Sequence, residues 1–340
     1  MPAEPVLSIV IDNYNYGRFL AEAIDSALAQ DIDEVEVIVV DDGSTDHSRD
    51  VIASYGQRIH AVLKPNGGQA SALNAGFAVS RGAFVLFLDA DDRLTADAAS
   101  GSLALMREGV SQIHCPLPLI DEAGRLTGQS MPRRPLQDGD VAQMFVEWGP
   151  YAVPVVSCSG NIWSRRFLSR VMPIPEAPYR LCADGYLLAL GGLFGRIERR
   201  SPFAHYRIHG SNSHWRNQSG FEALTRDARV FEANAQALAH WAGQLGLLVR
   251  PELWVRRDWR YQLRRHLLWR SGRQDSGPTA IDVLAAVWLA QTRLPLKLAL
   301  LSALAILLPL PCGLSCEPLC RIIAYHLGGP ALFLPWLRRA

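Results

Sequence analysis

Three short apolar segments in the first hundred residues each run directly into aspartate. The acids concerned are Asp12, the pair Asp41 and Asp42, and the group Asp89, Asp91 and Asp92. Clustered carboxylates repel one another unless a cation lies among them, and Mg²⁺ or Mn²⁺ takes one or two carboxylates together with phosphate oxygens. If the three groups meet in space, they predict a divalent-cation site that binds a diphosphate. The remaining aspartates are then left to accept hydrogen bonds from a base or a ribose.

The elements that must bring these acids together alternate along the chain. We predict strands at Leu7–Ile11, Val35–Val40, Ile59–Leu63 and Phe84–Leu88, and helices at Arg18–Gln30, Asp46–Tyr55 and Gln69–Ser80. Continuous apolar strands that alternate with helices indicate a parallel sheet covered on both faces. Ligands of such sheets bind beyond the carboxyl ends of the strands, where the aspartates would gather. Helix caps and turns would account for any one group of acids, but not for three groups at one edge.

Four segments in this order carry a family resemblance. They are Ser8–Asn15, Val39–Asp46, Gly67–Gly76 and Phe87–Asp92, and together they resemble the ordered motifs of family 2 glycosyltransferases over about the first 215 residues. The resemblance implies an α/β fold of the GT-A type, with a nucleotide-sugar-binding core and a mostly parallel sheet. It also implies that transfer inverts the anomeric carbon.

The same resemblance assigns expected roles to individual residues. It implies that Asp12, Tyr14 and Asp42 line the nucleoside pocket, that Asp89 lies near the ribose, and that Asp91 holds Mn²⁺ or Mg²⁺ on the diphosphate. Gln69 and Asn74 stand where the family places polar contacts to the donor. The alternative for these two amides is an exposed helix face.

Inverting transfer needs a base, because the acceptor hydroxyl loses its proton as it attacks. Asp184 stands where the family carries its catalytic acid, although many relatives have Glu-Asp and this chain has Ala183-Asp184. The alternative for Asp184 is a helix N-cap. His209 lies in a segment that resembles a late family motif, and it is expected to reach the metal or the diphosphate; a plain loop histidine is the alternative. Ser159–Asn161 is expected either to border one of the sugars or to form a turn.

The last third of the chain is rich in helix formers, tryptophan and arginine. Residues 253–273 are expected to form one basic amphipathic helix on which Val255, Trp259, Leu263 and Leu267 share a face, suited to an anionic membrane surface. A helix packed on the domain is the alternative. Residues 298–316 carry no charge, and residues 322–337 are nearly all apolar, which favours a re-entrant or interfacial segment over a full span; a buried helical hairpin is the alternative.

These observations predict a glycosyltransferase domain at residues 1–215 and a membrane-associated helical region at 216–340. The domain would divide into a nucleotide-binding half (1–110) and an acceptor half (111–215). We expect a UDP-sugar donor, with dTDP and GDP as alternatives, and a lipid-linked or cell-surface glycan acceptor, as in polysaccharide biosynthesis. The net charge of +1 points to no nucleic-acid partner. Because the N-terminus lacks a signal-peptide pattern, we expect a cytoplasmic enzyme at the inner face of the cell membrane.

Two other functions compete with this interpretation. Phe87–Asp91 resembles the nucleophile motif of haloacid dehalogenase-type phosphatases, but that motif normally ends a first strand, and here it ends the fourth. A non-catalytic nucleotide-sugar-binding subunit is the second rival, and its only support is the neutral Ala183. A processive polysaccharide synthase is disfavoured, because the chain has no Gln-x-x-Arg-Trp motif and no set of full spans.

Overall fold

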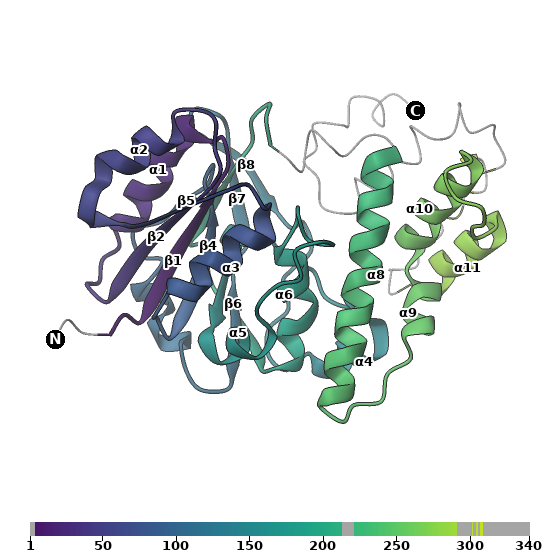
Figure 1. The fold of residues 1–340 in the computed structure, drawn as a ribbon. Coiled ribbons are helices and arrows are strands. Elements are labelled where there is room, and N and C mark those ends of the chain that lie inside the picture. The colour runs from purple at the N-terminus through teal and green to yellow at the C-terminus, as the bar shows by residue number, and fades with distance from the viewer. Residues whose placement is uncertain (1–3, 213–220, 291–300, 302–303, 305–306, 309–340) are drawn as a thin grey trace. The chain divides into compact units, whose positions relative to one another are not determined.

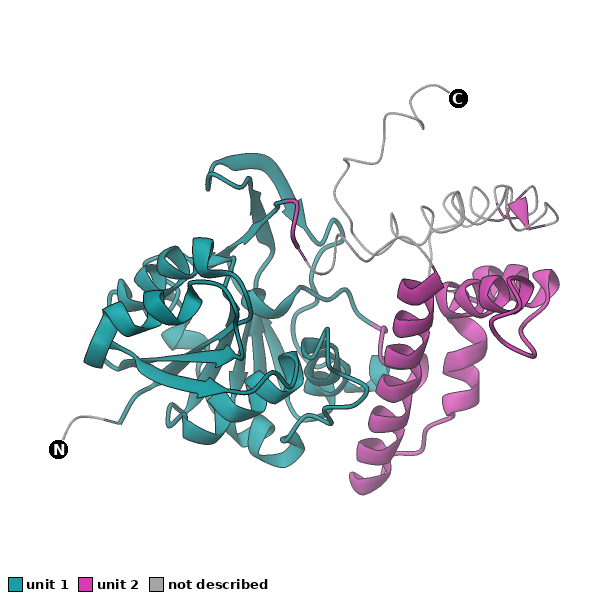
Figure 2. Cartoon of the chain, turned by 45° about the horizontal axis from the view of Figure 1, so that its top comes forward, with its two compact units in different colours: residues 1–145, 153–209 teal, residues 146–152, 210–340 magenta. Residues whose placement is uncertain are grey.

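The computed structural model describes residues 4–212 and 221–290, together with residues 301, 304, 307 and 308. The chain divides into two compact units, shown in Figure 2. Unit 1 comprises residues 1–145 and 153–209, and unit 2 comprises residues 146–152 and 210–340.

Unit 1 begins with the alternation that the sequence predicted (Figure 1). Its elements are β1 (Leu7–Asn13), α1 (Gly17–Leu28), β2 (Val35–Asp42), α2 (Ser48–Tyr55), β3 (His60–Lys64), α3 (Gln69–Val79) and β4 (Phe84–Asp89). All seven predicted elements are confirmed within a few residues. Three strands extend further than predicted, so that Asp12, Asp42 and Asp89 belong to the strands themselves.

Seven strands form the central sheet in the order β10-β6-β9-β4-β1-β2-β3, in which β6 is Val110–His114, β9 is Asn161–Ser164 and β10 is Arg196–Arg199. β9 runs antiparallel to β4 and β6, while the other neighbours are parallel. In this register Asp12 stands opposite Asp89, and Asn13 stands opposite Asp41. The prediction that the strand-end acids share one edge is therefore confirmed.

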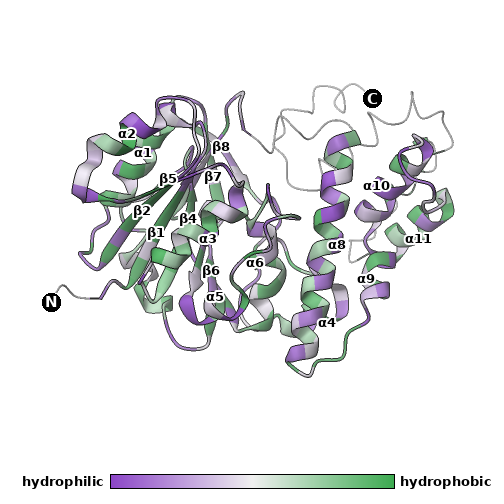
Figure 3. Ribbon diagram, viewed as in Figure 1, coloured by the Kyte–Doolittle hydropathy of each residue, from purple (hydrophilic) through white to green (hydrophobic). Residues whose placement is uncertain are grey.

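Helices cover both faces of this sheet. The connections from β1 to β2 and from β2 to β3 each place the next strand further along the sheet in one direction. The connection from β3 to β4 runs in the opposite direction and places β4 on the other side of β1. Because such crossovers are right-handed, α1 and α2 lie on one face and α3 lies on the other. The strands between them are hydrophobic in Figure 3. Gly76 lets α3 approach closely, since a Cβ there would lie 2.2 Å from Cγ1 of Val10.

A second, smaller sheet lies in the part of unit 1 where the sequence loses its alternation. Its order is β5-β11-β7-β8, with β5 at Arg93–Leu94, β7 at Leu117–Ile120, β8 at Leu126–Met131 and β11 at Ala204–Arg207. The helices of this part are α4 (Ala142–Trp148, which ends in unit 2), α5 (Arg165–Val171) and α6 (Asp184–Leu190). Short 3₁₀ turns occur at Gly56–Arg58, Ser100–Leu105, Cys158–Gly160 and Gly191–Leu193. Because β5 directly follows the acids after β4, its pairing with β11 brings the segment after β11 towards them.

Unit 2 contains α8 (Phe221–Gln244), α9 (Pro251–Arg257), α10 (Trp259–Arg270) and α11 (Ala280–Leu289). The prediction of one helix at residues 253–273 is wrong, because Asp258 separates α9 from α10. Its carboxylate accepts the Tyr261 N–H at 2.8 Å and so caps α10.

The apolar face that was expected to meet a membrane is mostly buried within the protein. Trp259, Leu263 and Leu267 are buried inside the protein, while Val255 is partly exposed. Arg264 is buried as well and lies 3.4 Å from a carboxylate oxygen of Asp227. The alternative, a helix packed within the domain, therefore describes α10.

No helix among the described residues is both long enough and apolar enough to cross a bilayer. The apolar runs at residues 298–316 and 322–337 lie outside the described residues, except for positions 301, 304, 307 and 308.

Candidate functional site

The end of β1 and the end of β4 bring two carboxylates together with a thiol. Ligand atoms of Asp12, Asp89 and Cys158 all lie within 4.8 Å of one another. Asp12 is a partly exposed residue, but its Oδ1 atom is buried and has no hydrogen-bond partner within the described part of the chain. A buried carboxylate oxygen without a donor is costly, so this corner of the site is suited to a positively charged group.

The pKa values of the cluster show the same imbalance. The pKa of Asp12 is raised to about 7, mainly by burial. A hydrogen bond from Gln69 lowers this pKa, and the negative charges of Asp91 and Asp184 add to the rise. Burial and the charge of Asp12 raise the pKa of Asp89 well above its usual value. The acids therefore repel one another, and a positive charge bound nearby would relieve this repulsion.

Asp91 and His209 meet although 118 positions separate them. Nε2 of His209 lies 2.9 Å from Oδ2 of Asp91, and its Nδ1 lies 3.1 Å from the guanidinium of Arg18. The imidazole is buried, with its ring centre 4.6 Å from that of Phe19 and 5.6 Å from that of Tyr16. The structure therefore brings together the two residues that the sequence proposed as metal ligands.

Ser159 ties the acids to the 3₁₀ turn at Cys158–Gly160. Its hydroxyl donates to Asp92 at 2.6 Å and accepts the backbone N–H of Asp89 at 3.1 Å. Asp92 also accepts the backbone N–H of Arg207 at 2.8 Å, and its pKa is raised well above the usual value, mainly by burial and by the charge of Asp91. Asn161 donates to main-chain oxygens of Val156, Ser157 and Cys158, at and just before the same turn. Residues 158–160 thus form a turn that positions the acids, and Asn161 begins β9.

Asp184 is the first residue of α6, and Ala183, not Asp184, occupies the N-cap position. Burial raises the pKa of Asp184 to about 6, although backbone N–H groups of Gly185, Asp184 and Cys158 lower it. The charge of Asp184 in turn raises the pKa values of Asp12 and Asp89. Asp184 therefore belongs to the same electrostatic cluster as the strand-end acids.

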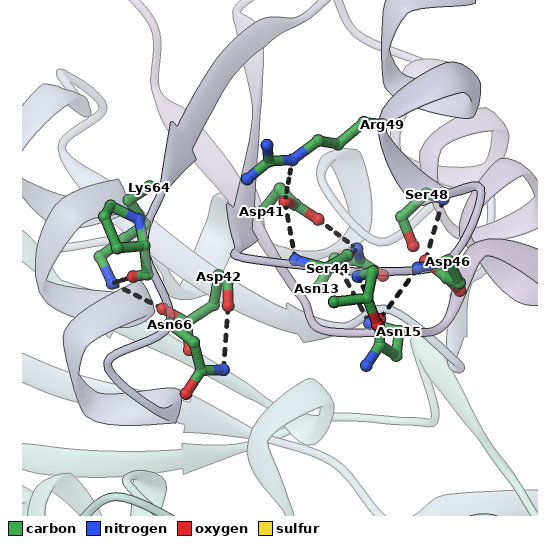
Figure 4. A network of polar contacts seen from close by, with 12 residues as sticks. Asn13, Asn15, Asp41, Asp42, Ser44, Asp46, Ser48, Arg49, Lys64 and Asn66 are labelled. Carbon is green, nitrogen blue, oxygen red and sulfur yellow. Dashed lines mark hydrogen bonds and ion pairs between the residues drawn. The ribbon is translucent and has the colours of Figure 1, made fainter.

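A separate polar network lies where β1 and β2 end (Figure 4). Both carboxylate oxygens of Asp42 are engaged: Oδ1 lies 2.5 Å from Nζ of Lys64 and accepts the N–H of Gly67 at 2.9 Å, and Oδ2 accepts the N–H of Gly68 at 2.7 Å. Asp42 therefore anchors the glycine loop before α3. A ligand would share this carboxylate with the protein.

Asp41 holds the neighbouring loop. Burial alone would raise the pKa of Asp41. Hydrogen bonds from Ser44 and Arg49 keep this pKa below its usual value. Asn13 donates to the same carboxylate at 3.0 Å. Tyr14, which follows Asn13, is 46% exposed, so its ring is accessible at this end of the sheet.

The two amides predicted on α3 lie in different surroundings. Gln69 donates to Oδ1 of Asp89 at 3.1 Å, so it belongs to the acid cluster. Asn74 uses both amide atoms for the main chain of Ile174, at 2.9 Å and 2.8 Å. Asn74 therefore fastens α3 to the segment before α6.

The donor set fits a hard divalent cation. Carboxylate oxygens are the ligands that Mn²⁺ and Mg²⁺ prefer, imidazole is compatible with Mn²⁺, and the buried Oδ1 of Asp12 lacks a partner among the described residues. Cys158 is a poor ligand for such an ion, because burial raises the pKa of its thiol well above the usual value.

Residues 8–161 match the family described as glycosyl transferase family 2. An uncharacterized glycosyltransferase of Nostoc sp. is 36% identical over 216 residues, which are 61% of this chain and 66% of that relative. One from Rickettsia prowazekii is 36% identical over 121 residues, or 35% of this chain and 38% of that relative. In both cases the match spans less than two thirds of the relative's own length.

The chain is also similar to a solved structure, S. aureus TarS residues 1–349 in complex with UDP. The TM-score is 0.55 at 17% sequence identity, and the match covers 95% of this chain and 91% of TarS 1–349. At this identity the similarity concerns the fold, which is of the GT-A type.

Proposed function

The chain belongs to glycosyl transferase family 2, and from that premise we propose that it transfers a sugar from a nucleotide-sugar donor to an acceptor hydroxyl, with inversion of the anomeric carbon. The observation that carries this proposal is the position of Asp184. It is a partly buried carboxylate whose pKa is raised to about 6 by desolvation, and it lies in the same cluster as the strand-end acids. Near neutral pH such a carboxylate is ionised and still basic enough to take a proton.

The reaction proceeds by displacement. The acceptor O–H gives its proton to the carboxylate of Asp184, the acceptor oxygen forms a bond to the anomeric carbon, and the bond from that carbon to the diphosphate breaks. The nucleoside diphosphate leaves with the bonding electron pair. Because Asp184 begins α6 and its carboxylate is held by N–H groups of Gly185 and Cys158, the base is oriented before the acceptor arrives.

The donor is held by the strand ends in this proposal. Asp12, Tyr14 and Asp42 line the nucleoside pocket, and Asp89 lies near the ribose. Asp91 and His209 would hold Mn²⁺ or Mg²⁺, which, when bound, neutralises charge on the leaving diphosphate. The nucleotide-binding half is residues 1–110 and the acceptor half is residues 111–215.

We propose UDP as the nucleotide of the donor. TarS has been solved in complex with UDP and with UDP-GlcNAc, which supports this choice. The acceptor is proposed to be a lipid-linked or cell-surface glycan, and the protein is proposed to work at the inner face of the cell membrane. The support for that location is the apolar composition of residues 298–316 and 322–337, and no longer the arginine-rich helix.

Cleavage of the donor tests the proposal without knowledge of the acceptor. We expect the full chain to release UDP from at least one of UDP-glucose, UDP-galactose or UDP-GlcNAc when Mn²⁺ is present, because water can replace the acceptor hydroxyl. Release is measured with a coupled UDP assay, and EDTA is expected to stop it. If GDP-, dTDP- and CDP-sugars are added to the panel and none is cleaved with either metal, the proposed transfer activity is wrong.

A further inference from the structure

Gln69 joins the acid cluster to the segment that carries Asp184. Its Nε2 donates to Oδ1 of Asp89 at 3.1 Å, while its Oε1 accepts the backbone N–H of Ala183 at 3.0 Å. One side-chain amide thus bonds both to the end of β4 and to the residue directly before Asp184.

The main chain of Gln69 holds the same segment at a second point. Its backbone N–H donates to the carbonyl oxygen of Arg180 at 2.8 Å. The two bonds from Gln69 therefore bracket residues 180–183. Between them lies Cys182, whose φ of 60° is unusual for a residue with a side chain. Such a conformation persists only where the surrounding structure enforces it, and the bonds on either side of Cys182 do this.

Gln69 is itself held in place from the other side. The N–H groups of Gly67 and Gly68 donate to Asp42, and Arg180 donates to the carbonyl oxygen of Gly67 at 3.2 Å. Gly68 packs against Arg180 so closely that a Cβ would lie 2.7 Å from its carbonyl oxygen. The loop before α3 and the loop before α6 therefore form one connected unit at the edge of the sheet.

From these contacts we propose that Gln69 is a positioning residue for transfer, which fixes the loop at 180–183 and so sets the place of Asp184 relative to Asp89. This role rests on the proposed function of Asp184. It differs from a contact to the donor, because it acts through the backbone of Ala183. A displaced base costs catalysis without weakening the donor, so the effect falls on kcat more than on nucleotide affinity.

The substitution Gln69→Met tests the proposal, because methionine has a similar length and makes neither hydrogen bond. Gln30→Met is the matched control. Gln30 makes the same kind of clasp in unit 1, since its Oε1 accepts the N–H of Ala99 at 2.9 Å and its Nε2 donates to the carbonyl oxygen of Thr95 at 3.0 Å. It has no part in the proposed site.

Two measurements are made on the full chain. Amide hydrogen exchange follows residues 180–186, where Gln69→Met is expected to speed exchange by about tenfold, the effect of losing one hydrogen bond. Cleavage of the UDP-sugar that the wild type turns over is expected to show a kcat lower by about 10–100-fold, with KM and the Kd for UDP changed by less than about threefold. Gln30→Met is expected to change neither the amide exchange at residues 180–186 nor the kinetics of UDP-sugar cleavage.

The opposite pattern would overturn the proposal. Unchanged exchange at residues 180–186, together with weaker UDP binding, would make Gln69 a donor-binding residue. If Gln69→Met does not fold, Gln69→Asn replaces it, because asparagine keeps the amide but is one methylene too short to reach the Ala183 N–H; unchanged exchange at residues 180–186 in that variant would also overturn the proposal. The exchange measurement needs no activity. A wild type that cleaves no nucleotide sugar would therefore refute the proposed function, while the effect of Gln69 on the loop at 180–183 would still be tested by exchange.

Discussion

Replacing Asp184 with asparagine is expected to lower kcat for donor cleavage or transfer by about 10²–10⁴-fold, the usual contribution of a general base. Asparagine keeps the shape of the side chain but cannot take the acceptor proton. The Kd for UDP is expected to stay within about threefold of wild type, because the base acts on the acceptor side. Steady-state kinetics and calorimetric titration with UDP measure the two quantities.

The pH dependence gives the same prediction a second readout. The pKa of Asp184 is raised to about 6 by burial, so the carboxylate is protonated and inactive below that pH and becomes a base above it. In the wild type, kcat/KM is therefore expected to rise as pH increases through about 6. The residual kcat/KM of Asp184→Asn is expected not to rise with pH in this range.

A surface substitution provides the control. Asp33→Asn changes an exposed carboxylate to the same amide, and it is expected to leave both the rate and the pH profile as in the wild type. Full turnover by Asp184→Asn with an intact acidic limb would show that another group accepts the proton, and it would favour a role in binding alone.

The second large effect is expected at Asp91. Asp91→Ala is expected to weaken UDP binding in the presence of Mn²⁺ by at least about tenfold, or about 1.4 kcal/mol. The variant should bind UDP equally well with and without the metal, because it lacks the carboxylate proposed to hold the cation. Calorimetric titration of UDP with Mn²⁺ and with EDTA gives both affinities.

Asp91→Asn separates the cation from the fold. An asparagine oxygen can still accept a hydrogen bond from His209, whose Nε2 lies 2.9 Å from Oδ2 of Asp91, but it brings no charge. We expect Asp91→Asn to melt near the wild-type temperature and yet to lose most of the metal-dependent affinity. If Asp91→Asn binds UDP with Mn²⁺ as tightly as the wild type does, Asp91 is not the metal ligand.

The first half of unit 1 could be predicted because its signals are local. A run such as Val37–Val40 is buried on both faces of a parallel sheet, so its composition alone identifies a strand. Asp42 and Asp89 then reach one edge through topology, since parallel strands present their carboxyl ends to the same side. The ends of β1, β2 and β4 were placed one or two residues too early, because the aspartates continue the strand pairing.

The contacts that arrange the site could not be predicted, because they join distant segments. No local pattern indicates that Arg207 would donate to Asp92, that Ser159 would bridge Asp92 and Asp89, or that Cys158 would lie beside Asp12. They depend on how β9 and β11 pair, and these strands are only four residues long. Asp258 was also missed, although an aspartate before a helical run is a capping signal.

The central claim is that the edge formed by β1, β2 and β4 binds a nucleoside diphosphate together with a divalent cation. A thermal-shift screen of the full chain with UDP, dTDP, GDP and CDP, each with Mn²⁺ and with EDTA, tests it most directly. A ligand at 100 times its Kd stabilises the native state by about 2.7 kcal/mol, so a bound nucleotide raises the melting temperature measurably. We predict a metal-dependent rise with UDP that Asp91→Ala abolishes. No rise with any of the four nucleotides, with or without the metal, would contradict the account.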